Sequence, residues 1–407
     1  MRSIHIITLC VVVTAALAAG CNREAPNVPA ASAPAASVAV INDNARLEAA
    51  VDDFIDGMFQ HYPTFAANAG KHEFDGKLPD YSPAGLKADA DWLHAERARF
   101  AAFGDDKLDE NGRFHRDYVL AVIDGQLFWL EDSGFPYSNP AFYTGDLSPS
   151  MYLTRPYAPL PERMAAFVTY QEALPKAIAQ IKANFKLPLP ASYIDLGVNS
   201  FGGYASFFKT DVPAIFAEVK DDALQARFKA SNAAAIKATQ DLADWLKAQK
   251  PHATHDYALG AAKFSKMLHA TELVDLPLDQ LKAIGESDLQ RNLDALKAAC
   301  DKFAPGKSLS ACVAKESADK PVGGAVEGAR TQLAGLRQFI VDKDLVTIPG
   351  PEQAKVEEAP PFNRWNFAYI EIPGPYEKNL PSVYYIAPPD PTWSKADQQA
   401  YIPGKAD

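Results

Sequence analysis

The sequence predicts a mainly α-helical protein, an elongated multi-helix domain that carries a small β hairpin near its C-terminal end. Apolar residues recur at helical spacing through most of the segment between residues 44 and 344, and Pro, Gly and capping residues mark the helix ends. Two short runs rich in aromatic and β-branched residues follow, at 365–375 and 380–389, and they flank a Pro-Gly-Pro turn. No stretch repeats at a fixed period, which argues against a solenoid.

The first residues, 1–20, have the pattern of a signal peptide. Arg2 precedes an apolar run that ends in small residues, and this run is shorter than the roughly 20 apolar residues of a spanning helix. Ala-Ala-Gly directly before Cys21 resembles the bacterial lipobox, which predicts that Cys21 is lipidated; the alternative is ordinary secretion with Cys21 as a free thiol. Asn22 stands where an inner-membrane retention signal would have Asp, so the resemblance to lipoprotein sorting implies an outer-membrane lipoprotein that faces the periplasm.

Residues 21–43 are rich in Ala, Pro and Ser and carry few large side chains. Such a segment cannot bury enough apolar surface to fold, so we expect a disordered tether that begins at the lipidated cysteine. The folded domain then spans 44–407. The formal net charge of −11 argues against a nucleic-acid partner and against an electrostatic membrane-binding face, which leaves the lipid anchor as the predicted contact with the membrane.

Helices are expected along the domain wherever an apolar stripe lies between start and stop signals. Ser82 and Pro83 provide an N-cap and a first helical residue, Pro63 ends the preceding helix, and Pro175 is expected to kink a later one. We expect irregular structure in a Pro- and Tyr-rich loop at 132–161 and around the paired glycines of 196–210. The expected helices are 44–63, 82–103, 114–132, 160–185, 221–250, 256–273, 277–300 and 326–344.

Cys300 and Cys312 are the cysteines that remain after the leader and the lipobox. They flank a Pro-Gly turn, and in an oxidising envelope compartment this arrangement predicts a disulfide bond. The alternative is a pair of buried thiols. No histidine lies between them, so the pair is a poor zinc site.

The histidines give no convincing metal site. His72-Glu73 lacks the second histidine of a His-Glu-x-x-His motif, and we interpret it as a surface pair. His252 and His255 are three residues apart at a helix break, where a solvent-exposed loop is the favoured interpretation; a site built from both and a distant acid is the alternative.

The remaining candidates give no catalytic site either. His269 and Glu272 lie on one helix face, as do many exposed pairs that stabilise a helix slightly. The sequence contains no Gly-x-Ser-x-Gly, Walker, dinucleotide-binding or calcium-loop motif. No catalytic residue is therefore predicted from the residues themselves.

Three segments, in order, resemble the bacterial domain of unknown function 885 family. They are "HYPTFAANAGKHEFDGKLPDYSP", "YALGAAKFSKMLHATELVDLPLDQLKAIGESDLQRNLDALKA" and "YIEIPGPYEKNLPSVYYIAPP". Members of that family resemble helical zinc metallopeptidases of the gluzincin type. The resemblance implies that a His-Glu-x-x-Pro-Gly-His motif follows the hairpin in complete members, where it would hold zinc and activate a water. It also implies that the hairpin, residues 366–387, pairs with the backbone of an extended peptide substrate.

The zinc motif is absent from residues 1–407, so no position inherits a catalytic or metal-ligand role. Zinc is expected for a complete family member and no cofactor for this chain. We therefore expect an inactive, truncated relative of a zinc metallopeptidase whose domain is incomplete at its C-terminus. The alternative is a non-catalytic periplasmic lipoprotein, complete as a helical binding or scaffold module. The lipid anchor, the tether and the expected surface tyrosines around 135–157 are its supporting features.

Overall fold

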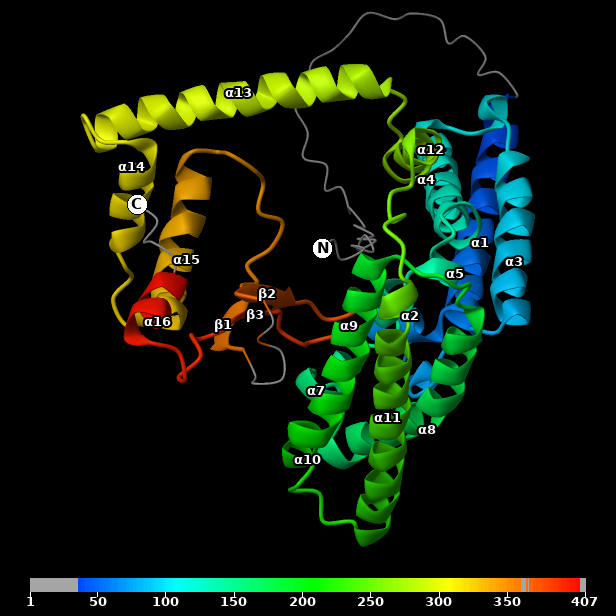
Figure 1. Cartoon of the computed structure of the whole chain (residues 1–407). Coiled ribbons are helices and arrows are strands. Elements are labelled where there is room, and N and C mark those ends of the chain that lie inside the picture. Colours follow the sequence, from blue (N-terminus) through cyan, green and yellow to red (C-terminus); the bar gives the residue numbers. More distant parts are fainter. Residues whose placement is uncertain (1–35, 360–363, 365, 403–407) are drawn as a thin grey trace, which may run out of the picture. The chain divides into compact units, whose positions relative to one another are not determined.

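The computed structural model describes residues 36–359, 364 and 366–402, and these form a mainly helical protein with one small sheet (Figure 1). The mainly α class predicted from the sequence is confirmed. Contacts divide the chain into two units. The first unit comprises the described residues up to Asp275 together with Gly374–Glu377, and the second comprises Leu276–Pro373 and the described residues from Lys378 onward.

The N-terminal part of the first unit packs around three long helices, α1, α3 and α4. Ser82 caps α3 by accepting a hydrogen bond from the Gly85 amide, and Asp109 caps α4 in the same way from Gly112. Their apolar stripes meet in a core whose members are buried: Leu47, Phe54, Leu93, Phe100 and Ile123. The helices of this part are α1 Ala36–His61, α2 Pro63–Asn68, the 3₁₀ turn η1 His72–Phe74, α3 Pro83–Ala101, η2 Asp105–Lys107, α4 Glu110–Leu127 and the π-helical turn η3 Phe128–Asp132.

Two expectations differ from the structure in this region. Helix α1 begins at Ala36, so residues 36–43 are helical although their composition predicts a tether. Extending an existing helix fixes one residue for each new hydrogen bond and needs no new nucleus, so residues of ordinary helix propensity can join it. The loop expected at 132–161 forms three short helices, α5 Phe135–Ser138, α6 Ala141–Thr144 and α7 Ser150–Thr154.

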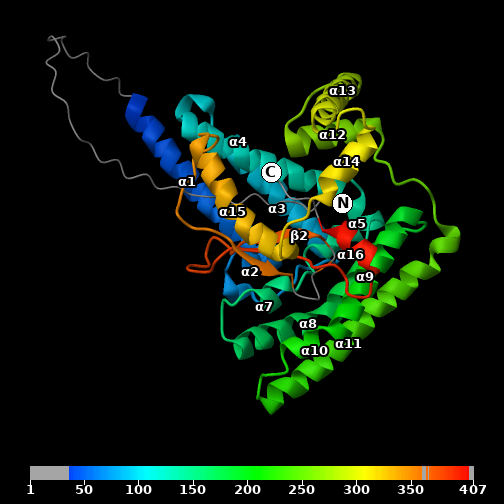
Figure 2. The same cartoon turned by 90° about the vertical axis from the view of Figure 1, so that its left-hand side faces the viewer.

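The rest of the first unit is built on α8 Leu160–Asn184, α9 Ala191–Thr210 and α11 Asp222–Ala248, which run side by side (Figures 1 and 2). Helix α8 continues through Pro175. Helix α9 includes Gly202 and Gly203, where the sequence predicts irregular structure. Each glycine weakens a helix by about 1 kcal/mol, and burial of Phe201 and Phe208 on the same helix outweighs that loss. The remaining elements are α10 Val212–Ile215, η4 Lys250–His252 and α12 Ala261–Glu272.

The second unit contains helices and a three-stranded sheet. Helices α13 Leu278–Phe303 and α14 Leu309–Ala318 are followed by α15 Gly324–Asp342, strands β1 Lys355–Glu358, β2 Ala368–Glu371 and β3 Val383–Ile386, and helix α16 Lys395–Tyr401. The strand order is β1-β3-β2, with β1 parallel and β2 antiparallel to β3. The predicted hairpin is thus confirmed as β2 and β3, and β1 is a strand that the sequence analysis did not predict.

Candidate functional site

The predicted cysteine bridge is present. Cys300, near the end of α13, forms a disulfide bond with Cys312 of α14, and both residues are buried. The alternative of two buried thiols is therefore wrong. The leader 1–20 and the predicted lipidation site Cys21 lie outside the described residues.

The structure brings no metal site together at the other candidate histidines. His252 and His255 are both exposed, His252 at the end of the 3₁₀ turn η4 and His255 in the loop beyond it. His269 makes its hydrogen bond to Asp275, at 2.6 Å, rather than to Glu272. Within the part of the chain that the structure describes, no group of three or more His, Cys, Asp or Glu side chains could hold a metal ion.

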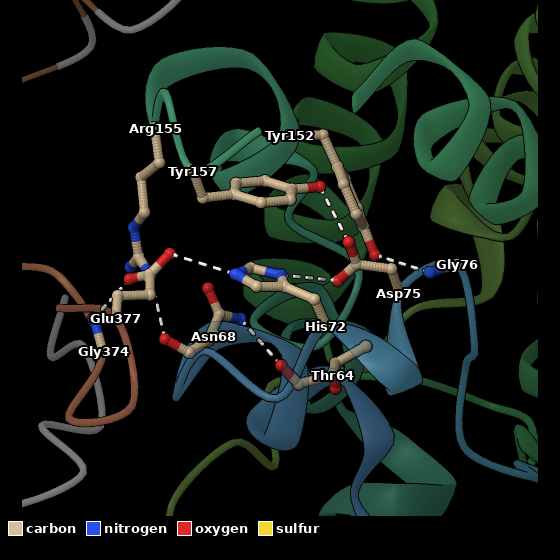
Figure 3. Close-up of polar contacts among 10 residues, drawn as sticks. All are labelled: Thr64, Asn68, His72, Asp75, Gly76, Tyr152, Arg155, Tyr157, Gly374 and Glu377. Atoms are coloured by element: carbon tan, nitrogen blue, oxygen red, sulfur yellow. Dashed lines mark hydrogen bonds and ion pairs between the residues drawn. The ribbon is translucent and has the colours of Figure 1, made fainter. Parts of the chain in front are cut away.

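His72 corrects the interpretation of His72-Glu73 as a surface pair. Glu73 is exposed, whereas the His72 side chain is 30% exposed and lies between two other carboxylates (Figure 3). Its Nδ1 is 3.2 Å from Asp75 Oδ1, and its Nε2 is 3.4 Å from Glu377 Oε1. With Arg155 and Tyr157 these residues form a polar group that we call the His72 cluster.

Glu377 is the most buried charge of the His72 cluster, with a side chain that is only 2% exposed. Its Oε2 accepts hydrogen bonds from Arg155, at 3.1 Å, and from the Gly374 amide, at 2.5 Å. Arg155 also donates to the carbonyl of Asn68, at the end of α2. The guanidinium therefore holds α2 and the turn 374–377 together (Figure 3).

The turn 374–377 packs so closely against the end of α2 that Gly70 and Gly374 have no room for a side chain. A Cβ on Gly374 would lie 2.2 Å from the carbonyl carbon of Ala69, and a Cβ on Gly70, whose φ is +96°, would lie 2.7 Å from Glu377 Cγ. The Tyr376 amide donates to the Ala69 carbonyl at 3.0 Å. The Lys71 ammonium lies 4.3 Å from the centre of the Tyr376 ring. The turn is thus fixed by backbone contact as well as by charge.

Asp75 lies at the other end of the cluster. Tyr157 donates to Asp75 Oδ2 at 2.8 Å and stacks on the His72 ring with 3.8 Å between centroids. Burial raises the pKa of Asp75, against the opposing effect of the hydrogen bonds from Tyr157 and His72. Burial, then the neighbouring Asp75 carboxylate, raises the pKa of Tyr157. Tyr157 therefore stays a neutral hydrogen-bond donor.

The tyrosines around 135–157 do not form the exposed surface expected from the sequence. Tyr143 and Tyr152 are buried, and Tyr157 is half-buried in the cluster. Tyr143 donates to the Pro136 carbonyl, and Tyr152 accepts from the Gly76 amide. These hydroxyls brace the loop between α4 and α8.

The His72 cluster combines one guanidinium and one imidazole with two carboxylates. None of the five residues is a serine or a cysteine, the usual nucleophiles of covalent catalysis. The nearby Thr64 hydroxyl has no hydrogen-bond partner among the described residues. Sequence reasoning missed this cluster because Arg155 and Glu377 are 222 residues apart, with no spacing signal to connect them.

The hairpin offers a different feature, an edge strand. The Phe367 carbonyl accepts from the Ala387 amide at 2.8 Å, and Tyr369 is opposite Tyr385. Because inward and outward residues alternate in an antiparallel pair, Ala368 and Ile370 direct their backbone N–H and C=O groups away from β3. No strand among the described residues pairs with that side of β2.

Helices long and apolar enough to cross a membrane do not occur in the described part of the chain. The model of the family "Bacterial protein of unknown function (DUF885)" matches residues 63–402. A solved structure from Shewanella oneidensis, described as a "putative lipoprotein of unknown function", matches with a TM-score of 0.68 and 23% sequence identity. The match covers 88% of this chain and 67% of that one, and it shows a shared fold. No curated protein matches the chain.

Proposed function

The chain belongs to the DUF885 family of bacterial proteins, and from this premise we propose that it is a lipoprotein of the cell envelope that binds extended peptides along its hairpin. The lipoprotein assignment is supported by the apolar leader before Cys21 and by the structural neighbour from Shewanella oneidensis, which is itself described as a lipoprotein. The expected position is the outer membrane, with the folded part in the periplasm, since Asn22 follows the cysteine.

The peptide proposal depends on one observation, the outward-facing edge of β2. Ile370 is half-exposed, and its backbone N–H and C=O face away from β3, as do those of Ala368. An extended peptide can add to such an edge as a further strand, so that main-chain hydrogen bonds supply affinity. The hairpin 366–387 is the predicted partner surface.

Peptide hydrolysis by zinc, which the family resemblance implies for complete members, does not fit the residues described here. Zinc needs three or four nitrogen, sulfur or carboxylate ligands around one point. The described residues contain no such group, because the His72 cluster supplies a single imidazole and Glu377 Oε2 already accepts hydrogen bonds from Arg155 and the Gly374 amide. We therefore derive no step through zinc, and the proposal is one of peptide binding.

Fluorescence anisotropy with a defined probe tests the proposal. The probe is a fluorescein-labelled, C-terminally amidated peptide of ten alternating Thr and Val residues, compared with a version N-methylated at every residue so that both of its edges are blocked. We expect the methylated peptide to bind at least tenfold more weakly, because its blocked amides cannot pair with β2. Ile370→Pro removes an outward amide and is expected to weaken binding similarly, whereas Ile370→Val retains the amide and binding.

Equal binding of the two peptides, or unchanged binding by Ile370→Pro in a variant with wild-type circular dichroism, would contradict the proposal. The lipid anchor is tested separately in cells. We expect Cys21→Ser to abolish incorporation of radiolabelled palmitate. Persistent labelling of Cys21→Ser would rule out that residue as the anchor.

A further inference from the structure

The second unit contains a groove that the proposed function does not use. It has a volume of about 670 Å³ and lies between α15 and the outer edge of β1. Arg330, Leu333 and Ala334 line one wall from α15, and residues 353–358 line the other. The groove is open to solvent: Leu333 is 37% exposed and the Arg330 side chain 50% exposed.

The outer edge of β1 presents backbone groups to this groove. The Lys355 amide donates to Ser382 and the Ala359 amide to Ile386, so residues 355, 357 and 359 bond toward β3. In a parallel pair the residues between them point the other way. Val356 and Glu358 therefore direct their N–H and C=O groups into the groove, and their amides have no hydrogen-bond partner among the described residues.

Arg330 changes the balance of hydrogen-bond donors and acceptors along this edge. Its Nε donates to the Val356 carbonyl at 3.0 Å and so occupies the outward acceptor. Its NH1 faces the exposed Glu327, at 3.1 Å. Surface pairs of this kind contribute little and exchange readily. Around Val356 the groove therefore offers mainly donors, two backbone amides and a guanidinium, and the Glu358 carbonyl is the outward acceptor of β1 that Arg330 does not use.

A group that only accepts hydrogen bonds fits this donor set, and a carboxylate is the common one in polypeptides. Pairing of a longer strand past Val356 is hindered because Arg330 already uses the carbonyl there. A chain terminus meets both conditions, since its carboxylate can end beside Arg330 while the preceding residues extend along Leu333 and Ala334. We propose that the groove between β1 and α15 binds the free C-terminus of an extended peptide, with Arg330 as the carboxylate partner.

Charges around the groove are consistent with this assignment. Lys355 adds a second cation to the lining. Glu358 is paired with Arg364 at 2.6 Å and Glu327 with Arg330, so the negative charge of each glutamate is partly neutralised. Glu357 is the remaining acid in the lining, and it lies on the same face of the strand as Lys355.

Two peptides that differ only at the terminus test the proposal on the full chain. Both are fluorescein-labelled at the N-terminus with the sequence Gly-Ser-Thr-Val-Thr-Val, one with a free carboxylate and one amidated. We expect the acid to bind at least tenfold more tightly than the amide, because charge-assisted hydrogen bonds are about twice as strong as neutral ones. Arg330→Gln is expected to erase that preference, and Arg330→Lys to restore part of it.

Ala334→Leu, on the exposed surface of α15, is expected to weaken binding of the acid peptide by filling the groove. Equal affinity for acid and amide in the wild-type chain, or an unchanged preference in Arg330→Gln, would overturn the proposal. The inference is independent of the β2 edge. Ile370→Pro is expected to leave acid-peptide binding unchanged, and Arg330→Gln to leave binding of the amidated Thr-Val probe unchanged, so the two proposals fail separately.

Discussion

Replacing Glu377 by glutamine tests whether the His72 cluster stabilises the first unit. The substituted side chain would keep the size of the original but would lose the charge that faces Arg155 and His72. The Glu377 side chain is 2% exposed and that of Arg155 is 12% exposed, so water cannot replace the lost carboxylate. Removing one partner of a buried ion pair destabilises by about 3–5 kcal/mol. Arg155 retains its hydrogen bond to the Asn68 carbonyl, which favours the lower end of that range.

Hydrogen exchange followed by mass spectrometry is the suitable assay, because a chain of two units need not unfold in one step. We expect Glu377→Gln to lower the opening free energy of peptides that cover residues 64–77 and 374–377 by about 3 kcal/mol. Glu73→Gln is the matched control, an exposed glutamate on the same loop as His72, with an expected change within about 0.5 kcal/mol. A change below about 1 kcal/mol for Glu377→Gln, with the control unchanged, would refute the view that this pair holds the turn.

Three further predictions concern other parts of the chain. Burial raises the pKa of Asp146 from 3.8 to about 6, so its contribution to stability is complete below about pH 4 and is lost as the pH rises through 6. Asp146→Asn should therefore gain up to roughly 3 kcal/mol relative to wild type between pH 4 and 7 in urea titrations, and a constant difference would contradict this. Replacing Cys300 and Cys312 by serine should destabilise the α13–α14 region by about 3 kcal/mol in hydrogen exchange, since the bridge closes a short loop, whereas an unchanged profile would contradict it. Purified chain should hold no stoichiometric zinc by elemental analysis, and one tightly bound zinc per chain would show a site that the described residues do not contain.

Local signals account for most of the helices that the sequence predicts correctly. Ser82 caps the helix that it was expected to cap, because cap chemistry depends only on residues within one turn. The cysteine bridge and the hairpin follow from close spacing along the chain in the same way. Strand β1 was missed because Lys-Val-Glu-Glu carries one apolar residue, and its partner β3 lies about 28 residues further on.

The polar sites were hidden for a related reason. His72 is followed by Glu73, which it does not contact. The carboxylates that it does contact belong to Asp75, three residues away, and Glu377, 305 residues away. The groove at Arg330 exists because one edge of β1 faces α15. Because β1 itself was not predicted from the sequence, the groove beside it could not be predicted either. Side-chain periodicity indicates which face of a helix is buried, but it does not indicate which distant loop covers it.

The turn 374–377 has a consequence for how this protein can be divided. It belongs to the first unit, although it joins two strands of the second, so the chain passes between the units at three points. A fragment that stops at Asp275 would discard four residues of the body it is meant to isolate, including the carboxylate that Arg155 meets in the intact chain. Stepwise deletion from the C-terminus would therefore destabilise the first unit before its contiguous part, up to Asp275, is reached. To study the first unit alone, residues 374–377 must be added back; otherwise the whole polypeptide is needed.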